Sequence, residues 1–172
     1  EFSIEAANTL MENLYQQQQR FFFSEEALVK VTRRSVDALF KKVCQDVADL
    51  MEVDRVEIWL FNDQLTTLTA ETYYDKRGDI SSFKNVLYQE KVPAYFEAIA
   101  NKRVLAIEDT RNNPIMDGLV ESLTTEYHEM QSMLDASIVL SWGVGGVICC
   151  LSKGERKWTP IHKQVLASIA DM

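Results

Sequence analysis

The amino-acid sequence predicts an α+β domain, in which a central antiparallel sheet carries the N- and C-terminal helices on one face and loops and short helices on the other. Three observations predict it. Two pairs of strand-like segments are each joined by a short turn, as in antiparallel hairpins. Helix-like segments precede the first pair and follow the second. A length of 172 residues suits one domain with its own core.

Two helices are expected before the first strand, because apolar residues recur there at intervals of three and four. The first covers residues 4–23 and has heptad-like spacing. Since so short a helix needs a partner to be stable, it is a candidate coiled coil. The second extends from Ser24 to about Met51. We therefore expect residues 1–34 to form a signalling or linker helix and residues 35–172 to form the domain.

Alternation of side chains predicts the first hairpin. Residues 56–61 read as a strand that is apolar on both faces near its end, and residues 66–74 return as a strand rich in Thr and Tyr. The turn between them contains Asn62 and Asp63. The polar segment 75–90 is expected to be a loop before a helix that begins at Pro93.

The second half of the sequence shows the same kinds of signal for strands, turns and helices. A short strand at residues 104–107 precedes a turn-rich segment and a helix that includes Leu119. Residues 133–142 and 144–151 form the second hairpin, around Gly143. Thr159 and Pro160 then cap a closing helix, as their preference for helix N-termini indicates.

The composition argues against several classes of function. The net charge of -8 argues against nucleic-acid binding, which needs a concentrated basic face. No apolar run approaches the length of a membrane span. Cys149 and Cys150 are adjacent in a strand and point to opposite faces, and Cys44 lies far away in sequence, so no disulfide framework is expected. We expect a cytoplasmic domain whose two ends continue into a longer protein.

Three motifs resemble the GAF family of signalling domains. They are VDRVEIWLF at residues 53–61, RVLAIEDTRNNP at residues 103–114, and SMLDASIVLSWGVGGVICCLSKGERKWTPIHKQVLASIADM at residues 132–172. The resemblance covers residues 35–172 and is strongest to GAF domains upstream of histidine kinase or diguanylate cyclase modules in bacterial signalling proteins. It implies a GAF/PAS-like fold.

The resemblance also implies a regulatory sensor. Such domains bind a small molecule between the sheet and its covering segments, and pass the signal through flanking helices to an output domain in the same chain. Two alternatives stay open: a ligand-free dimerisation relay, and a free methionine sulfoxide reductase, which would need a cluster of reactive cysteines. The separated cysteines favour a domain without enzymatic activity and without catalytic residues.

Several subfamilies have recognisable sites. Bilin-attaching members carry a Cys at a position near Gly118, so no covalent bilin is expected, and the cofactor is unknown. Of the cyclic-nucleotide signature, Lys153 and the aromatic Trp158 match. His128 and His162 lack metal-ligand spacing, so no metal site is expected and both are predicted to be exposed.

Candidate ligand-binding residues share one expected location, the strand face and covering segments around the pocket. They are Trp59, Phe61, Tyr73, Tyr95, Asp109, Arg111, Met116, Tyr127, Met133, Asp135 and Ser137. The aromatic and methionine side chains could equally form core. Asp109 could instead cap its turn and Asp135 could be a buried hydrogen-bond partner. Arg111 could bind an anionic ligand or pair with Asp109 or Asp117.

A parallel homodimer is predicted through four apolar heptad positions and the C-terminal helix. The four are Ile4, Met11, Leu14 and Phe21. Replacing Met11 and Leu14 together by Lys should dissociate the dimer, because it places charge in the seam. Light scattering coupled to size-exclusion chromatography measures the mass. The control Asn13→Lys lies off the seam and should remain dimeric, and an unchanged mass of the double variant would refute the prediction.

Overall fold

The computed structural model describes residue 12 and residues 33–78, 85–123, 128–141 and 143–172. Within these ranges the chain forms six strands, with helices before, between and after them. The helices are α3 (Arg33–Met51), α4 (Pro93–Asn101), the 3-10 helix η1 (Pro114–Met116), α5 (Leu119–Ser122) and α6 (Pro160–Ala170). The strands are β1 (Arg55–Phe61), β2 (Thr67–Asp75), β3 (Val86–Tyr88), β4 (Val104–Ile107), β5 (Ser132–Leu140) and β6 (Gly143–Ser152).

The strands form one sheet in the order β3-β2-β1-β6-β5-β4, and each neighbouring pair is antiparallel. Both expected hairpins are present, β1–β2 and β5–β6. They meet through β1 and β6, where Arg55 is opposite Leu151 and Leu60 is opposite Gly146. The α+β antiparallel architecture predicted from the sequence is therefore confirmed.

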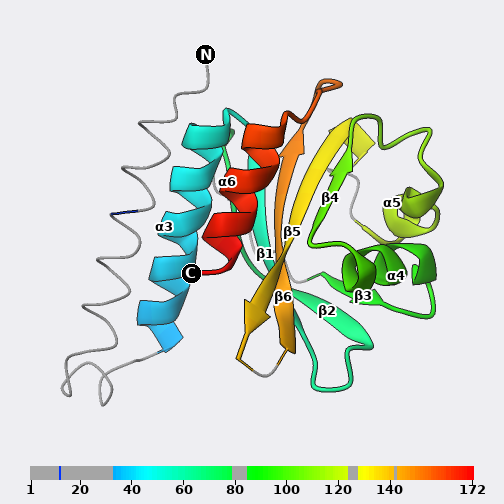
Figure 1. Cartoon of the computed structure of the whole chain (residues 1–172), viewed down its shortest axis with the longest axis horizontal. Coiled ribbons are helices and arrows are strands. Elements are labelled where there is room, and N and C mark those ends of the chain that lie inside the picture. The colour runs from blue at the N-terminus through cyan, green and yellow to red at the C-terminus, as the bar shows by residue number, and fades with distance from the viewer. Residues whose placement is uncertain (1–11, 13–32, 79–84, 124–127, 142) are drawn as a thin grey trace.

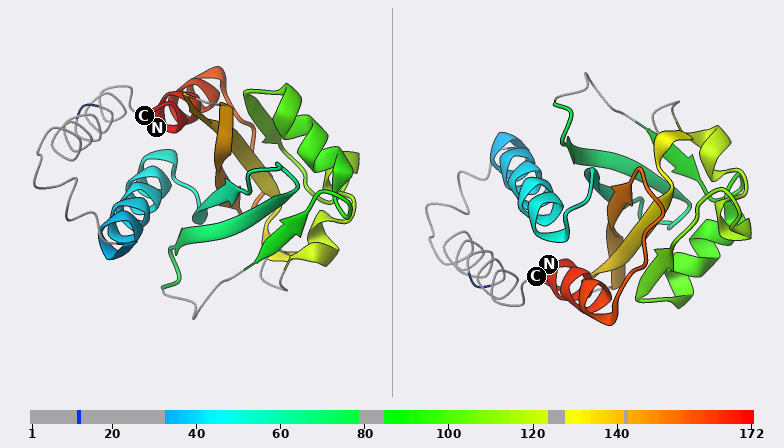
Figure 2. Two further views of the ribbon diagram at one scale, coloured as in Figure 1. Left: turned by 90° about the horizontal axis from the view of Figure 1, so that it is seen from below. Right: turned by 90° about the horizontal axis from the view of Figure 1, so that it is seen from above.

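Helices α3 and α6 lie on the same face of the sheet (Figures 1 and 2). α3 packs over β1 and β2, whereas α6 packs mainly over β5. Both contribute to one buried core, the helix-side core. Its members are Cys44, Val47, Ala48, Met51, Val53, Val56, Ile58, Leu134, Ala136, Ile148, Cys150, Trp158, Val165, Leu166, Ile169 and Ala170.

The opposite face is covered by α4, η1, α5 and their connections (Figure 1). A second core, the site-side core, fills this space. Its members are Trp59, Leu68, Ala70, Leu87, Val92, Tyr95, Phe96, Ala98, Ile99, Leu105, Ile107, Met116, Leu119, Met130, Met133, Val147, Cys149 and Leu151. Because strand side chains alternate between faces, β1, β5 and β6 contribute to both cores.

Two expectations about local structure were wrong. The segment 75–90, expected to be a loop, contains β3, whose Leu87 is 3% exposed and opposite Leu68 of β2. His162, expected to be exposed, is 8% exposed because its ring packs edge-on against Trp158 and its Nδ1 accepts a hydrogen bond from the Thr159 backbone N–H. His128 is exposed, as predicted.

The helices of the described residues include none that is long and apolar enough to cross a membrane. The longest of them, α3, spans 19 residues and alternates buried apolar side chains with exposed charged ones.

Gly118 holds the turn between η1 and α5 close to the start of α4. Its φ is 77°, in the left-handed region that favours glycine. A Cβ added there would lie 2.7 Å from the backbone oxygen of Lys91. Both conformation and space therefore require glycine at this position.

Gly118→Ala should lower the free energy of unfolding more than Gly78→Ala does. Gly78 also has a positive φ, 109°, but an added Cβ there would have nothing within 4 Å. Gly78→Ala should therefore be destabilised only by the backbone strain, about 1 kcal/mol. Gly118→Ala should be destabilised by at least about 1 kcal/mol more, because its Cβ also clashes with Lys91. Urea denaturation measures both values. Equal losses in the two variants would show that the contact with Lys91 is not constrained.

Candidate functional site

The strand register places a row of polar side chains across the middle of the site-side face. Tyr73 of β2 is opposite Glu57 of β1, Glu57 is opposite Cys149 of β6, and Cys149 is opposite Asp135 of β5. Cross-strand partners point to the same face. Glu57 is 0% and Asp135 1% exposed, so the row brings two buried carboxyl groups beneath α4.

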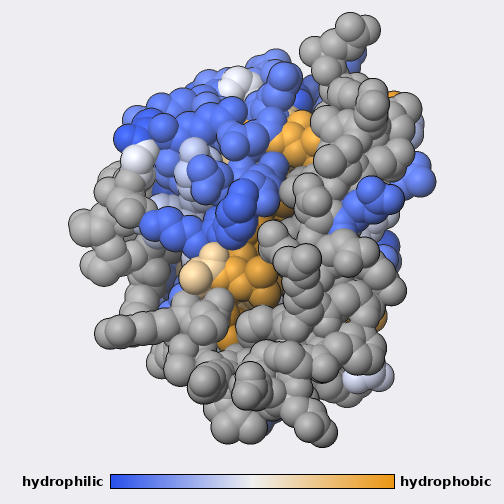
Figure 3. All heavy atoms as spheres, turned by 90° about the vertical axis from the view of Figure 1, so that its left-hand side faces the viewer, coloured by the Kyte–Doolittle hydropathy of each residue, from blue (hydrophilic) through white to orange (hydrophobic). Residues whose placement is uncertain are grey.

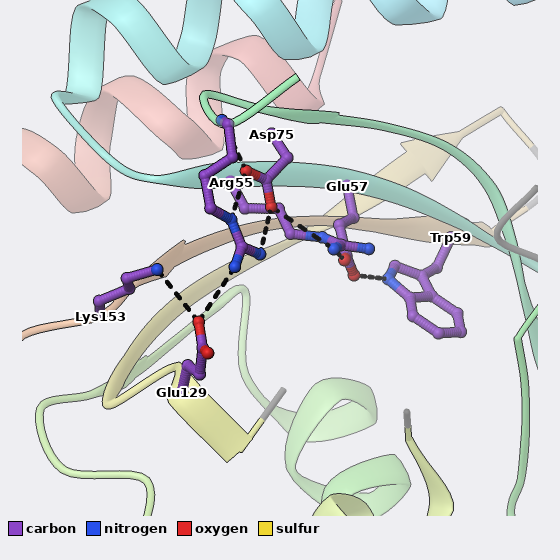
Figure 4. A network of polar contacts seen from close by, with 7 residues as sticks. Arg55, Glu57, Trp59, Asp75, Glu129 and Lys153 are labelled. Carbon is purple, nitrogen blue, oxygen red and sulfur yellow. Dashed lines mark hydrogen bonds and ion pairs between the residues drawn. The ribbon is translucent and has the colours of Figure 1, made fainter. Parts of the chain in front are cut away.

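Glu57 is held by a pair of donors from its own strand (Figure 4). Arg55 Nε donates to one carboxylate oxygen at 2.5 Å, and Trp59 Nε1 donates to the other at 2.8 Å. The guanidinium of Arg55 also lies 3.6 Å from Asp75 and 4.5 Å from the centre of the Tyr73 ring. Arg55, Glu57 and Trp59 occupy alternate positions of β1, so their side chains lie on the same face of the sheet.

The network continues from Asp75 to the surface (Figure 4). Arg77 binds Asp75 at 2.9 Å and Glu129 at 3.0 Å, and Lys153 binds the same Glu129 oxygen at 3.0 Å. Burial alone would raise the pKa of Asp75, but hydrogen bonds and charge from Arg77, with the charge of Arg55, lower it. Glu129, next to the covering segments, is thereby tied to the ends of β2 and β6.

Asp135 has a different environment. Its Oδ2 accepts a hydrogen bond of 2.6 Å from the hydroxyl of Tyr95 in α4. Its Oδ1 is buried and accepts no hydrogen bond from the described residues. Burial raises the pKa of Asp135 to about 7; weak hydrogen bonding from the Cys149 thiol and the hydrogen bond from Tyr95 lower it, and the negative charge of Glu57 raises it. The carboxyl group therefore holds its proton far above the usual pH range of aspartate.

Aromatic side chains surround this polar row. Trp59 and Tyr95 are each 4% exposed. The Phe96 ring contacts the Phe61 ring at 5.7 Å and the Tyr95 ring at 6.4 Å, both edge-on. Aromatic side chains next to a few polar groups suit a largely apolar ligand that carries a few polar groups of its own.

The remaining candidate residues fall into three groups. Met116 of η1 and Met133 of β5 lie in the site-side core, and Ser137, buried in β5, donates weakly through its Oγ to Ile99 O at 3.4 Å. Tyr127 lies outside the described residues. Two members of the set, Asp109 and Arg111, belong to an outer turn.

In that turn Asp109 acts as the cap. Its carboxylate accepts hydrogen bonds from the Asn112 side chain at 2.6 Å and the Arg111 backbone N–H at 3.0 Å, which lower its pKa. The side chain of Arg111 is exposed. The structure thus separates these two residues from the buried row.

The three cysteines are free and buried. Cys149 lies in the site-side core and Cys150 in the helix-side core, so the prediction that they point to opposite faces is confirmed. Burial raises the pKa of all three thiols, which disfavours the reactive thiolate. Over the described ranges, no cluster of three or more His, Cys, Asp or Glu side chains could hold a metal ion.

Sequence reasoning missed Arg55, Glu57 and Cys149 as members of the site. A signal for two of them was present: Arg55 and Glu57 occupy the same alternation as Trp59 in an otherwise apolar strand. Charged side chains at such positions need internal partners, which identifies them as a buried pair.

Comparisons with known proteins agree with this geometry. A family model described as "GAF domain" matches residues 35–172. A phycocyanobilin-bound GAF domain from a cyanobacterial phytochrome superposes with a TM-score of 0.72 and 11% identity, covering 96% of this chain and 90% of that one. The GAF domain of an Acinetobacter phosphoenolpyruvate-protein phosphotransferase gives 0.68 and 16%, covering 95% and 89%.

A third structure is an enzyme, the type II free methionine-R-sulfoxide reductase of Thermoplasma acidophilum, with a TM-score of 0.61, 14% identity, and coverage of 81% of this chain and 89% of that one. No curated protein matches this chain in sequence. At these identities the structural likeness shows the fold alone.

The antiparallel sheet with helices over both of its faces defines an α+β domain of the GAF type. The chain belongs to the GAF domain family, a family of sensor and regulatory domains in signalling proteins.

Asp135→Asn should flatten the pH dependence of stability and stabilise the ligand-free domain at pH 8. The folded carboxyl keeps its proton up to about pH 7, whereas the unfolded one loses it near pH 4. Between these values the folded state binds more protons, so wild-type stability falls as pH rises, by on the order of a few kcal/mol.

Urea denaturation at pH 5 and pH 8 measures this effect. Asp109→Asn is the control, because the pKa of that carboxyl, in the outer turn, is shifted in the opposite direction and its removal should leave the decline in place. A wild-type stability that does not fall between the two pH values would contradict the prediction.

Proposed function

We propose that this GAF domain binds a small molecule between the sheet and α4, and relays the binding event to an output domain. The observation that carries the proposal is the buried Oδ1 of Asp135, which accepts no hydrogen bond from the described residues and lies on the face that also carries Trp59. An unsatisfied buried polar group is costly in a folded protein, and a ligand would satisfy it.

Ligand binding is consistent with the structural neighbours. One is described as phycocyanobilin-bound, and another as a far-red absorbing state with bound biliverdin IXa. A fold hosts many ligands, so these names support the capacity of the fold and not the identity of the ligand.

The relay would use the terminal helices. Apolar residues reach the surface among polar ones on the side where α3 lies (Figure 3), and Leu39, Phe40 and Val43 of this helix are half-buried. The predicted N-terminal helix and its four heptad residues lie outside the described residues. We propose that residues 1–34 and α6 pair with a second copy and continue to an output module of the histidine kinase or diguanylate cyclase type. Three free thiols are consistent with a cytoplasmic setting.

A ligand-free relay is the second candidate. The observation in its favour is the dense packing of the site-side core, where Trp59, Tyr95, Phe96 and Met133 are each at most 5% exposed. In that case the domain's own side chains fill the space. We do not propose reductase activity, because the thiols are buried and their pKa values are raised.

Native mass spectrometry of the chain purified from cells tests the first proposal. We expect one small molecule bound per domain, released and identified on denaturation. A chain without bound ligand would be followed by a screen of candidate metabolites, because a weak ligand is lost in purification.

Methyl-labelled methionines give this screen an internal control. Met116, Met130 and Met133 lie in the site-side core, whereas Met51 lies in the helix-side core across the sheet. A ligand in the proposed site should shift the first three methyl signals most. Shifts confined to Met51 would place binding elsewhere, and a metabolite panel that shifts none would favour the ligand-free relay.

A further inference from the structure

The charged side chains around Arg55 form a network that extends from the buried site-side face to the surface, and their charges compensate one another. Arg55, Arg77 and Lys153 supply three cations, and the carboxylates of the same network are Glu57, Asp75 and Glu129. Each of these carboxylates forms an ion pair with at least one of the cations (Figure 4). The charges of the network therefore sum to zero, and its buried members Arg55, Glu57 and Asp75 are paired with one another or with Arg77.

Asp135 lies outside this neutral network. Three titratable groups of the described chain act on it: Tyr95 from α4, Cys149 from β6 and, one strand further, Glu57 of β1. Its neighbour on β4 is the apolar Leu105. None of these groups is a cation, and one of them is a second carboxylate.

We propose that Asp135 binds a positively charged nitrogen of the ligand, so that the domain recognises a small organic cation with an apolar or aromatic body. This inference rests on the proposed binding site and adds its charge selectivity. The free Oδ1 accepts a hydrogen bond from the charged N–H group, and the ligand's charge replaces the proton that Asp135 otherwise holds.

The surroundings define the rest of the ligand class. Trp59, Tyr95 and Phe96 supply aromatic faces in the same core, and such faces attract cations as well as apolar groups. Anionic groups are disfavoured here, because Glu57 and Asp135 are both buried with 1% exposure or less. A ligand that reaches Asp135 must displace part of the packing between α4 and the sheet.

Three probes of the same shape test the charge selectivity: benzylamine, which is cationic, benzyl alcohol, which is neutral, and benzoate, which is anionic. Titrations followed at the methyl signals of Met116, Met130 and Met133 should give the tightest binding for benzylamine and the weakest for benzoate. Since only ionised Asp135 binds the cation, benzylamine affinity should rise about tenfold from pH 6 to pH 8. The affinity for benzyl alcohol should not rise.

Two variants assign the effect to the carboxyl group. Asp135→Asn should abolish both the preference for benzylamine and its pH dependence. Tyr95→Phe is the matched control, because it removes the hydroxyl that binds Oδ2 but leaves the carboxyl group, so the preference should persist. If Asp135→Asn fails to fold, the pH titration of the wild-type chain decides by itself.

The outcomes separate this inference from the proposed function. Binding of benzoate or benzyl alcohol at the three methionines with affinity equal to that of benzylamine would overturn the charge selectivity and support the binding site. An anionic ligand without a cationic nitrogen, released from the purified chain, would do the same. Absence of any shift with all three probes would count against both.

Discussion

The central strands of this domain are covered on both faces, so a charge on them has no access to water. Arg55 is 1% and Glu57 0% exposed in β1. An isolated buried ion costs several kcal/mol, and a pair is tolerated only with good geometry and additional hydrogen bonds. Glu57 meets this condition through Arg55 and Trp59, and Arg55 through Asp75 as well. The need to pair these charges fixes the Trp59 indole against Glu57, and it joins Arg55 at the start of β1 to Asp75 at the end of β2.

Much of the fold could be predicted because it is encoded locally. The β5–β6 hairpin follows from alternation around Gly143, and the start of α6 from Thr159 and Pro160. The strand β3 could not be predicted in this way. It is three residues long, and its position depends on pairing with Thr67–Thr69 of β2. The burial of His162 likewise depends on Trp158.

The site was predictable in part for the same reason. Alternation correctly placed Met133, Asp135 and Ser137 on one face of β5, and that face proved to be the one beneath α4. It did not reveal that Asp135 and Glu57 lie two strands apart in one row, because the β1–β6 register joins segments about 90 residues apart in sequence. Asp109 and Arg111 were placed near the site by their sequence neighbourhood, whereas the turn directs their side chains outward.

The alternation of β6 has a mechanical consequence. Cys149 belongs to the core beneath α4 and Cys150 to the core beneath α3 and α6, and a single peptide bond joins them. The sheet is thus a single layer of backbone between two close-packed cores. A displacement of the β6 backbone at Cys149, in one core, therefore also moves the next residue, Cys150, in the other core. The packing on one face of the sheet and the packing on the other therefore act on the same stretch of backbone, at positions one residue apart.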